Sequence, residues 1–258
     1  MIERYLLAVP FIHASLSLSL NIDREYLFLL VFRSQYFARS EEIELEEMGD
    51  YPRDARIKLS IGTKQEGDAE CALTFLRGLA FDHHRGLLLV VDTNNYRVQV
   101  FSCDDGGSFV SMFGEKGNQP GQFGTPWGLA IDHDHDRILI VDRDNHRVQS
   151  WSLSEQSFLS CIGHRGSGDL EFNKPVGIAI DKHHHRIIIA DTNNHRLVFL
   201  SSIDLSFLFK IGKRGARPGE FQYPSGIAID DDRHRIIVCD SRNHRVQVLS
   251  SIDGSFLF

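Results

Sequence analysis

The sequence lacks the features that mark several classes of protein. Only 4 of its 258 residues are cysteine, and no two of them form a Cys-x-x-Cys pair. We therefore expect reduced thiols, with neither a disulfide framework nor a cysteine zinc site. With only 7 prolines and 21 glycines against 42% apolar residues, the composition is that of a globular chain and excludes collagen-like or disordered classes.

A general positive field for nucleic acid is also missing, because the net charge is −7. Residues 1–56 hold 6 Lys and Arg against 10 Asp and Glu, of totals of 28 and 35, so the remainder is nearly neutral. Residues 5–22 contain no Asp, Glu, Lys or Arg, and their first part leaves a signal peptide ending near Ala14 open. Pro10 and the alternating Ser15–Leu20 favour a strand instead, which predicts a cytoplasmic protein with no membrane span.

The positive feature is an internal repeat. A Gly-x-Ala-x-Asp segment occurs four times at spacings of 50, 49 and 49 residues. The copies are Gly78–Asp82, Gly128–Asp132, Gly177–Asp181 and Gly226–Asp230. Each is followed by a polar turn, an aliphatic run ending in Asp, an Asn-containing loop into Arg, and a further apolar run.

Four short apolar runs per unit, bounded by Gly, Asn and Asp, indicate four strands. Helical periodicity is absent. Four strands at a period near 50 residues are typical of a β-propeller blade, so the fold class is all-β. Ala at the centre of the first run suits the innermost strand, and we interpret the Gly before it as a sharp turn into the channel.

The repeated strings resemble the NHL repeat. They include Pro-x-Gly-Ile-Ala-Ile-Asp, Asp-Thr-Asn-Asn-His-Arg and Phe-Gly-x-x-Gly, and they cover residues 57–258. The first copy departs, with Leu76-Arg-Gly78 where the others have Pro-x-Gly. The resemblance implies a propeller, and NHL propellers resemble six-bladed rings.

Residues 1–56 are interpreted as a degenerate blade or an N-terminal extension. Residues 57–62 match the outermost strand of a preceding blade, and Ser255–Phe258 match the beginning of the same strand in the fourth unit. Four clear blades and one degenerate blade leave three possibilities open: a five-bladed ring, a ring completed by another segment or chain, or a fragment of a longer protein.

One candidate site is the ring of Asp and Arg that recurs in every unit. Its structural interpretation is that Asp caps the loop while Arg bonds carbonyls or a carboxylate. Its functional interpretation is a ligand-binding face of cations and aromatic rings. The residues of this face are Arg97, Arg147, Arg196 and Arg245 with Tyr96, His146, His195 and His244.

A second candidate consists of residues that do not repeat. Trp127 occupies the variable position of Pro-x-Gly, and Arg143, Tyr223 and Arg242 are also particular to their units. An amphipathic aromatic residue beside arginines is typical of a binding hot spot, and filling a gap between blades is the alternative.

Eight of the thirteen histidines lie in the turns between the first two strands of each unit. Because these turns are polar tips separated by whole blades, we expect a solvated rim and no metal or other cofactor. No Gly-x-Ser-x-Gly, Cys/His pair or phosphate-binding loop occurs in a suitable context.

We therefore expect a non-enzymatic recognition module with a protein partner. The resemblance leaves open an RNA-binding propeller, or a ubiquitin-ligase substrate-recognition subunit whose RING and B-box portions would come from another chain. It also leaves open a metal-dependent lyase of the peptidylglycine-amidating type, which would require His and carboxylate groups in the channel. The innermost strands offer mostly Gly, Ala and aliphatic residues.

Overall fold

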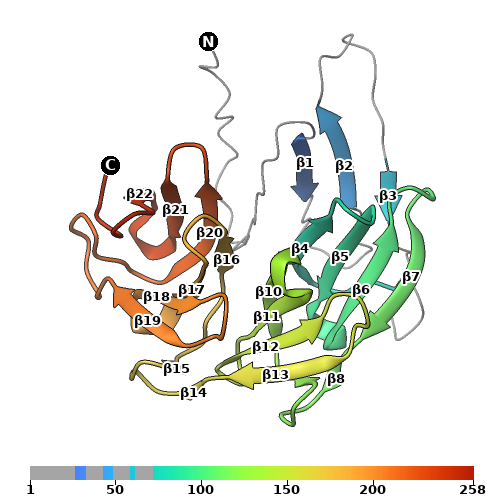
Figure 1. The fold of residues 1–258 in the computed structure, drawn as a ribbon, viewed down its shortest axis with the longest axis horizontal. Helices are drawn as coiled ribbons and strands as arrows, with labels where there is room; N and C mark the ends of the chain where they lie inside the picture. The colour runs from blue at the N-terminus through green and yellow to red at the C-terminus, as the bar shows by residue number, and fades with distance from the viewer. Residues whose placement is uncertain (1–26, 33–42, 49–58, 62–71) are drawn as a thin grey trace.

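The computed structural model describes residues 27–32, 43–48, 59–61 and 72–258 (Figure 1). Within these ranges the chain is built from β-strands and from 3₁₀ turns of three residues each. No helix in the described part of the chain has the length and apolar character needed to cross a membrane.

Residues 72–258 form four sheets that follow one another around a common centre (Figure 1). The first blade comprises β4 (Leu76–Asp82), β5 (Leu87–Asp92), β6 (Arg97–Ser102) and β7 (Ser108–Phe113). The second comprises β10 (Pro126–Asp132), β11 (Arg137–Asp142), β12 (Arg147–Ser152) and β13 (Phe158–Ile162). The third comprises β16 (Ile178–Asp181), β17 (Arg186–Asp191), β18 (Arg196–Ser201) and β19 (Phe207–Ile211). The fourth comprises β20 (Pro224–Asp230), β21 (Arg235–Asp240) and β22 (Arg245–Ser250).

Consecutive strands of each sheet pair antiparallel, and β4, β10, β16 and β20 lie toward the centre (Figure 1). The predicted all-β propeller architecture is confirmed. In the fourth blade, Phe256 forms a bridge with Leu249 of β22, where the sequence predicted the beginning of an outermost strand.

Short elements connect the blades. Parallel two-residue pairs join β8 (Glu115–Lys116) to β9 (Gln122–Phe123) and β14 (His164–Arg165) to β15 (Glu171–Phe172). The 3₁₀ turns are η1 (Thr93–Asn95), η2 (His133–His135), η3 (Thr192–Asn194) and η4 (Ser241–Asn243).

A separate antiparallel sheet precedes the four blades. It contains β1 (Leu27–Phe32), β2 (Ile43–Met48) and β3 (Leu59–Ile61), with β2 in the middle. β3 lies within residues 57–62, which were predicted to form an outermost strand. The predicted boundary at residue 56 and the possible signal peptide fall outside the described residues, so both stay predictions.

The hydrophobic core lies between neighbouring sheets. Leu89 and Val91 of β5 pack with residues of the second blade such as Ile140, whereas Leu88 and Val90 pack on the other face of the first blade. Because both faces of an inner sheet are buried, its strands are continuous aliphatic runs without a polar face. The outer face of the fourth sheet is more open, and Val246 is 56% exposed. The expectation that another segment or chain completes the ring stays a prediction.

Glycine in the innermost strands permits close packing of adjacent blades. A Cβ on Gly128 would lie 2.5 Å from the carbonyl oxygen of Val176, which belongs to the third repeat unit. The φ angle of Gly128 is not positive, so its lack of a side chain serves this close approach and not a left-handed backbone. Gly163 does need a left-handed backbone, at φ +98°, and a Cβ there would lie 2.5 Å from the buried ring of Phe172.

A buried ion pair joins each blade to the connection that precedes it. In the second blade, the carboxylate of Asp142 accepts hydrogen bonds from Arg147 Nε at 3.1 Å and Asn145 Nδ2 at 2.8 Å. Its other oxygen accepts hydrogen bonds from the backbone N–H groups of Gly124 at 2.9 Å and Thr125 at 3.1 Å. Asp142 is fully buried, so this carboxylate depends on its protein partners.

The guanidinium group completes the link by donating to carbonyl oxygens. Arg147 donates to those of Asn118, Gln119 and Gln122, which belong to the connection between the first and second blades. Arg196 repeats the pattern in the third blade, with Asp191 and the carbonyls of Ser167, Gly168 and Glu171. The structural interpretation of the Asp and Arg ring is therefore confirmed in these blades.

Replacing Arg147 by Met should destabilise the propeller by roughly 3–5 kcal/mol, because Asp142 would remain buried without a counter-charge. Arg233→Met is the matched control, since Arg233 pairs with Asp230 but its side chain is 63% exposed. This control should lose less than about 1 kcal/mol. Urea unfolding followed by tryptophan fluorescence measures both losses, and equal losses would contradict the assigned role of the buried pair.

Candidate functional site

The predicted face is formed by the turns that follow β5, β11, β17 and β21. At the end of each of these four turns one residue adopts the left-handed conformation, with φ between +52° and +57°. These residues are Tyr96, His146, His195 and His244. A non-glycine side chain is uncommon in this conformation, so the turn is held by the surrounding network. We call this surface the turn face.

The arginines predicted to bind a ligand are engaged within the protein. Arg97, Arg147 and Arg196 are buried and pair with Asp92, Asp142 and Asp191 at 2.8–3.1 Å. The binding interpretation is corrected for these three residues, because their guanidinium groups already donate to internal carboxylate and carbonyl oxygens. Arg245 pairs with Asp240 at 2.8 Å in the same way, although its side chain is 29% exposed.

Trp127 fills a gap between blades. It is only 8% exposed, and its ring lies 4.2 Å from the guanidinium carbon of Arg77 and 5.0 Å from that of Arg143. The sequence predicted a binding hot spot at Trp127 with gap filling as the alternative, and the burial of the ring favours gap filling. Its indole N–H has no hydrogen-bond partner among the described residues. Arg143, by contrast, is partly exposed and pairs with Asp144 at 3.0 Å.

Two of the predicted histidines connect neighbouring repeat units. His146 Nδ1 accepts a hydrogen bond from the backbone N–H of Lys174, and His195 Nδ1 accepts one from Tyr223, both at 3.1 Å. The ring of Tyr223 meets His195 edge-on at 4.6 Å. These contacts require neutral imidazole at Nδ1. His146 and His195 therefore have a structural role, because each links its turn to the next repeat unit.

Other predicted residues remain accessible on the turn face. Arg242 and His244 are exposed, and the guanidinium carbon of Arg242 lies 5.4 Å from the centre of the Tyr223 ring. In the first blade, Lys116 Nζ lies 4.9 Å from the centre of the Tyr96 ring. The turn face thus presents cations over aromatic rings at two separate places.

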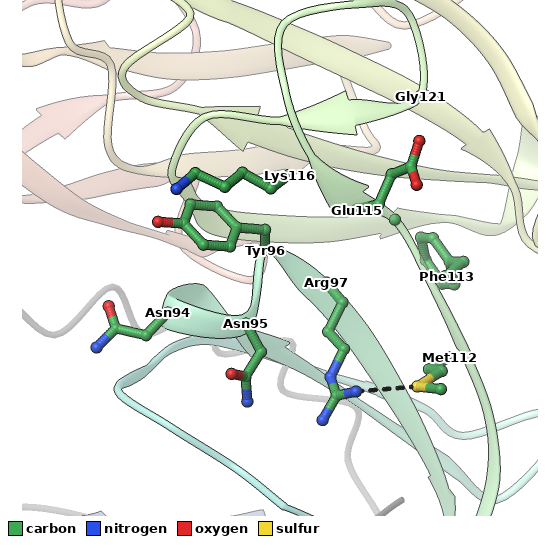
Figure 2. Close-up of a pocket in the computed structure, with 10 residues that line it drawn as sticks. Asn94, Asn95, Tyr96, Arg97, Met112, Phe113, Glu115, Lys116 and Gly121 are labelled. Atoms are coloured by element: carbon green, nitrogen blue, oxygen red, sulfur yellow. Dashed lines mark hydrogen bonds between the residues drawn. The ribbon is translucent and has the colours of Figure 1, made fainter. Parts of the chain in front are cut away.

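A pocket of about 770 Å³ lies beside Tyr96. Its walls come from the turn after β5 and from the chain between β7 and β9. It is lined by Asn94, Asn95, Tyr96, Arg97, Met112, Phe113, Gly114, Glu115, Lys116 and Gly121. Figure 2 shows Lys116 alongside the Tyr96 ring, and the Arg97 guanidinium group directed at the sulfur of Met112, 3.3 Å away.

The pocket lies at the repeat unit that departs from the others. In the other blades, the asparagine of the turn donates to a carbonyl of the preceding glycine-rich connection, namely Gly117, Gly166 or Gly215. Asn95 donates to the Thr74 hydroxyl at 3.3 Å and, like the asparagines of the other turns, to the Asp of its own turn, Asp92, at 2.9 Å. Sequence reasoning missed Asn94, Met112 and Lys116. The departure at Leu76-Arg-Gly78 was the available signal, because it marked the first unit as atypical.

The opposite ends of the innermost strands carry the histidine turns. Contrary to the expectation that these turns are kept apart by whole blades, His83 and His84 of the first blade lie 5.0 and 4.4 Å from His133 of the second, between ring centres. The ligand atoms of Asp82, His84 and His133 all lie within 4.8 Å of one another. These three residues are the group in the described ranges that could hold a metal ion.

Cysteine chemistry receives no support from the described thiols. Cys103, Cys161 and Cys239 are free. Burial, with a smaller contribution from Asp104, raises the pKa of Cys103 to about 11, and burial also raises the pKa of Cys239. A thiol with a raised pKa is protonated and unreactive at neutral pH.

Comparison with known proteins agrees with the geometry. The family model described as NHL repeat matches residues 172–198 and 221–249. The repeats are NHL repeats. A second family model, described as a 6-bladed beta-propeller, matches residues 79–168 of this NHL-repeat propeller. No curated protein matches the chain.

Solved structures show the same fold at low sequence identity. A nidogen/laminin complex has a TM-score of 0.59 and 19% identity over 87% of this chain and 74% of that chain. A structure of U3-55K has a TM-score of 0.56 and 15% identity over 70% of this chain. Hydrazine synthase of Kuenenia stuttgartiensis has a TM-score of 0.56 and 11% identity over 76% of this chain. The NHL-repeat chain matches about half of these last two, 50% and 52% of their lengths.

The histidines of the turn face should make the fold sensitive to acid. Burial and the nearby Arg165 lower the pKa of His146, and burial and Arg214 lower that of His195. A lowered histidine pKa means that the unfolded chain binds more protons, so this stabilisation is present above the unfolded pKa of about 6.5 and is lost as pH falls below it.

The double variant His146→Asn, His195→Asn should therefore lose less unfolding free energy than the wild type between about pH 7.5 and pH 5. Asparagine tolerates the left-handed conformation, and its side-chain oxygen can accept a hydrogen bond. Urea unfolding at several pH values measures the difference. His244→Asn, at the same turn position but exposed, is the control; an equally large effect there would refute the assignment.

Proposed function

We propose that this NHL-repeat propeller is a non-catalytic recognition module that binds a protein segment in the pocket beside Tyr96. The observation that carries the proposal is the pocket itself, a concavity of about 770 Å³ on a turn face whose other groups are largely engaged internally. Concave sites of this size are typical of ligand-binding regions. A rigid set of packed sheets holds the pocket in place.

The chemistry of the lining favours a protein segment over a nucleic acid. Met112 is 44% exposed and Tyr96 is partly exposed, so the site offers apolar contact as well as hydrogen-bonding groups. The exposed cation Lys116 lies next to the exposed acid Glu115, which limits the local positive field. RNA recognition would require a stronger field for phosphate groups.

A mixed lining instead suits a segment with one apolar or aromatic side chain and one carboxylate. The carboxylate would meet Lys116, while the apolar group would contact Tyr96 and the thioether of Met112. The backbone of the segment could bond to Asn94 at the rim. This arrangement resembles the apolar centre and polar edge found in protein interfaces.

The fold adds support of a general kind. Propellers commonly serve as protein-binding modules, and one of the structures with this fold is a complex of two proteins, nidogen and laminin. At 19% identity that likeness concerns the fold alone.

The innermost strands favour a non-catalytic role over the peptidylglycine lyase. β10 has the sequence PWGLAID and β20 has PSGIAID, so their charged groups lie at the strand ends. A lyase of that type would need several histidine and carboxylate groups directed into the channel. We therefore propose binding without chemistry at the channel.

The proposal predicts that a photo-crosslinking residue in place of the exposed Asn94 captures a protein partner from cells that express the chain. Lys116→Glu should weaken recovery of that partner at least about tenfold by reversing the local charge. Quantitative mass spectrometry of the crosslinked material measures the recovery. Arg214→Glu is the matched control, because Arg214 is exposed and occupies the equivalent position in the connection after the third blade.

Equal loss in the two variants would indicate a nonspecific effect of charge and would contradict a site at the pocket. A gel-shift series with RNA across salt concentrations tests the other class of partner. Salt-sensitive RNA binding that Lys116→Glu removes would replace the proposal, since neutralised phosphates make affinity depend on salt. The buried Arg147 and Arg196 are unsuitable for this test because their replacement would disturb the fold.

A further inference from the structure

The end of the first blade opposite the turn face departs from the repeat in a second way. In every unit, the Asp that ends the innermost strand pairs in register with the first residue of the next strand. This residue is Arg137, Arg186 or Arg235 in three blades and Leu87 in the first. The substitution changes the environment of a buried carboxylate.

In the second and third blades, this arginine forms an ion pair with the corresponding carboxylate. Arg137 lies 2.9 Å from Asp132, and Arg186 lies 2.6 Å from Asp181. Asp82 is equally buried, at 0% exposure, but Leu87 offers it no charge. A buried carboxylate needs a positive partner, and in the first blade Arg85 of the following turn supplies it on Oδ2, which leaves Oδ1 without an arginine among the described residues.

Histidines from two blades converge on Asp82. Its Oδ1 lies 3.1 Å from His133 Nε2 of the second blade, and it also accepts a hydrogen bond from the backbone N–H of His84 at 3.1 Å. The imidazole of His84 lies 4.4 Å from that of His133, between ring centres. Three side chains with nitrogen or oxygen ligand atoms thus surround one point.

Because Arg85 bonds the Oδ2 atom of Asp82, the Oδ1 atom is left facing the point between the three side chains. Arg85 donates to Oδ2 at 2.9 Å and also lies 3.5 Å from Asp136, so it holds the carboxylate from the other side. The side chain of His133 is nine-tenths buried, and its Nδ1 has no hydrogen-bond partner among the described residues.

We propose that Asp82, His84 and His133 bind a divalent transition-metal ion, for which Zn²⁺ is the best-suited probe. Imidazole nitrogen and carboxylate oxygen are common zinc ligands, and three protein ligands leave a fourth position for water. Around a tetrahedral zinc ion, ligand atoms lie about 3.3–3.5 Å apart. His133 Nε2 and Asp82 Oδ1, at 3.1 Å, lie slightly closer together than this, and the exposed His84 can rotate toward them without disturbing the core.

The other histidine turns do not offer the same set. His135 lies 3.0 Å from Asp132, and His184 lies 3.0 Å from Asp181, but each of these carboxylates also carries its buried arginine. Among the described residues, a third ligand atom within 4.8 Å is present only in the group of Asp82, His84 and His133. The proposed site therefore belongs to the first blade and its neighbour, and it would join them through His133.

Isothermal titration of the untagged, chelator-stripped full chain with Zn²⁺ tests the proposal. We expect one ion per chain, and Co²⁺ substitution should give the visible absorption of a four-coordinate centre. His84→Gln and His133→Gln should each weaken zinc binding at least about tenfold. Leu87→Arg should have the same effect by supplying Asp82 with the guanidinium group present in other blades.

His184→Gln is the matched control and should leave the zinc affinity unchanged. Circular dichroism and thermal unfolding without metal show whether each variant folds. If His133→Gln or Leu87→Arg fails to fold, His84→Gln still tests the proposal, because His84 is exposed. In the wild type, saturating zinc should raise the melting temperature. Absence of one-to-one binding, or affinity that survives His84→Gln and is lost in His184→Gln, would overturn the proposal.

Discussion

In each blade, the Asp that ends the second strand forms a buried ion pair with the Arg that begins the third strand. The rest of the propeller depends on this interaction. Asp142 and Arg147 lie opposite each other in the register of β11 and β12, and both also bond to backbone of the connection that precedes their blade. This side-chain pair fixes the position of one sheet relative to the loop that comes from the preceding sheet. The hydrogen bonds between strands of a single sheet cannot do this. To fix this position, every hydrogen-bond donor and acceptor of the pair must have a partner, because an unpaired buried charge here would be strongly destabilising.

This constraint explains why the repeated arginines are poor candidates for ligand binding. Arg147 and Arg196 use their guanidinium groups for one carboxylate and several carbonyls each, so a ligand would compete with the fold itself. Chemistry becomes available where a unit departs from the repeat. Leu87 removes an arginine from the environment of Asp82, and the first turn opens onto a pocket at Tyr96.

The architecture was predictable from the sequence because it rests on local, repeated patterns. Strand runs, turn residues and the recurrence of Asp142 and Arg147 follow from period and residue type alone. The sequence left the burial of Trp127 open and did not predict the contact of His84 with His133, because both depend on how closely adjacent blades approach near the centre. Gly128 illustrates the same limit: its absence of a side chain serves the neighbouring backbone and not its own turn.

The two departures of the first blade lie at opposite ends of β4, where the first and second blades are in closest contact. At the Leu76 end, Trp127 stacks between Arg77 and Arg143, and at the Asp82 end His133 reaches across from the second blade. Between them, the backbone of Trp127 approaches Gly78 too closely for any side chain. The spacing of β4 and β10 is thus restrained along its whole length.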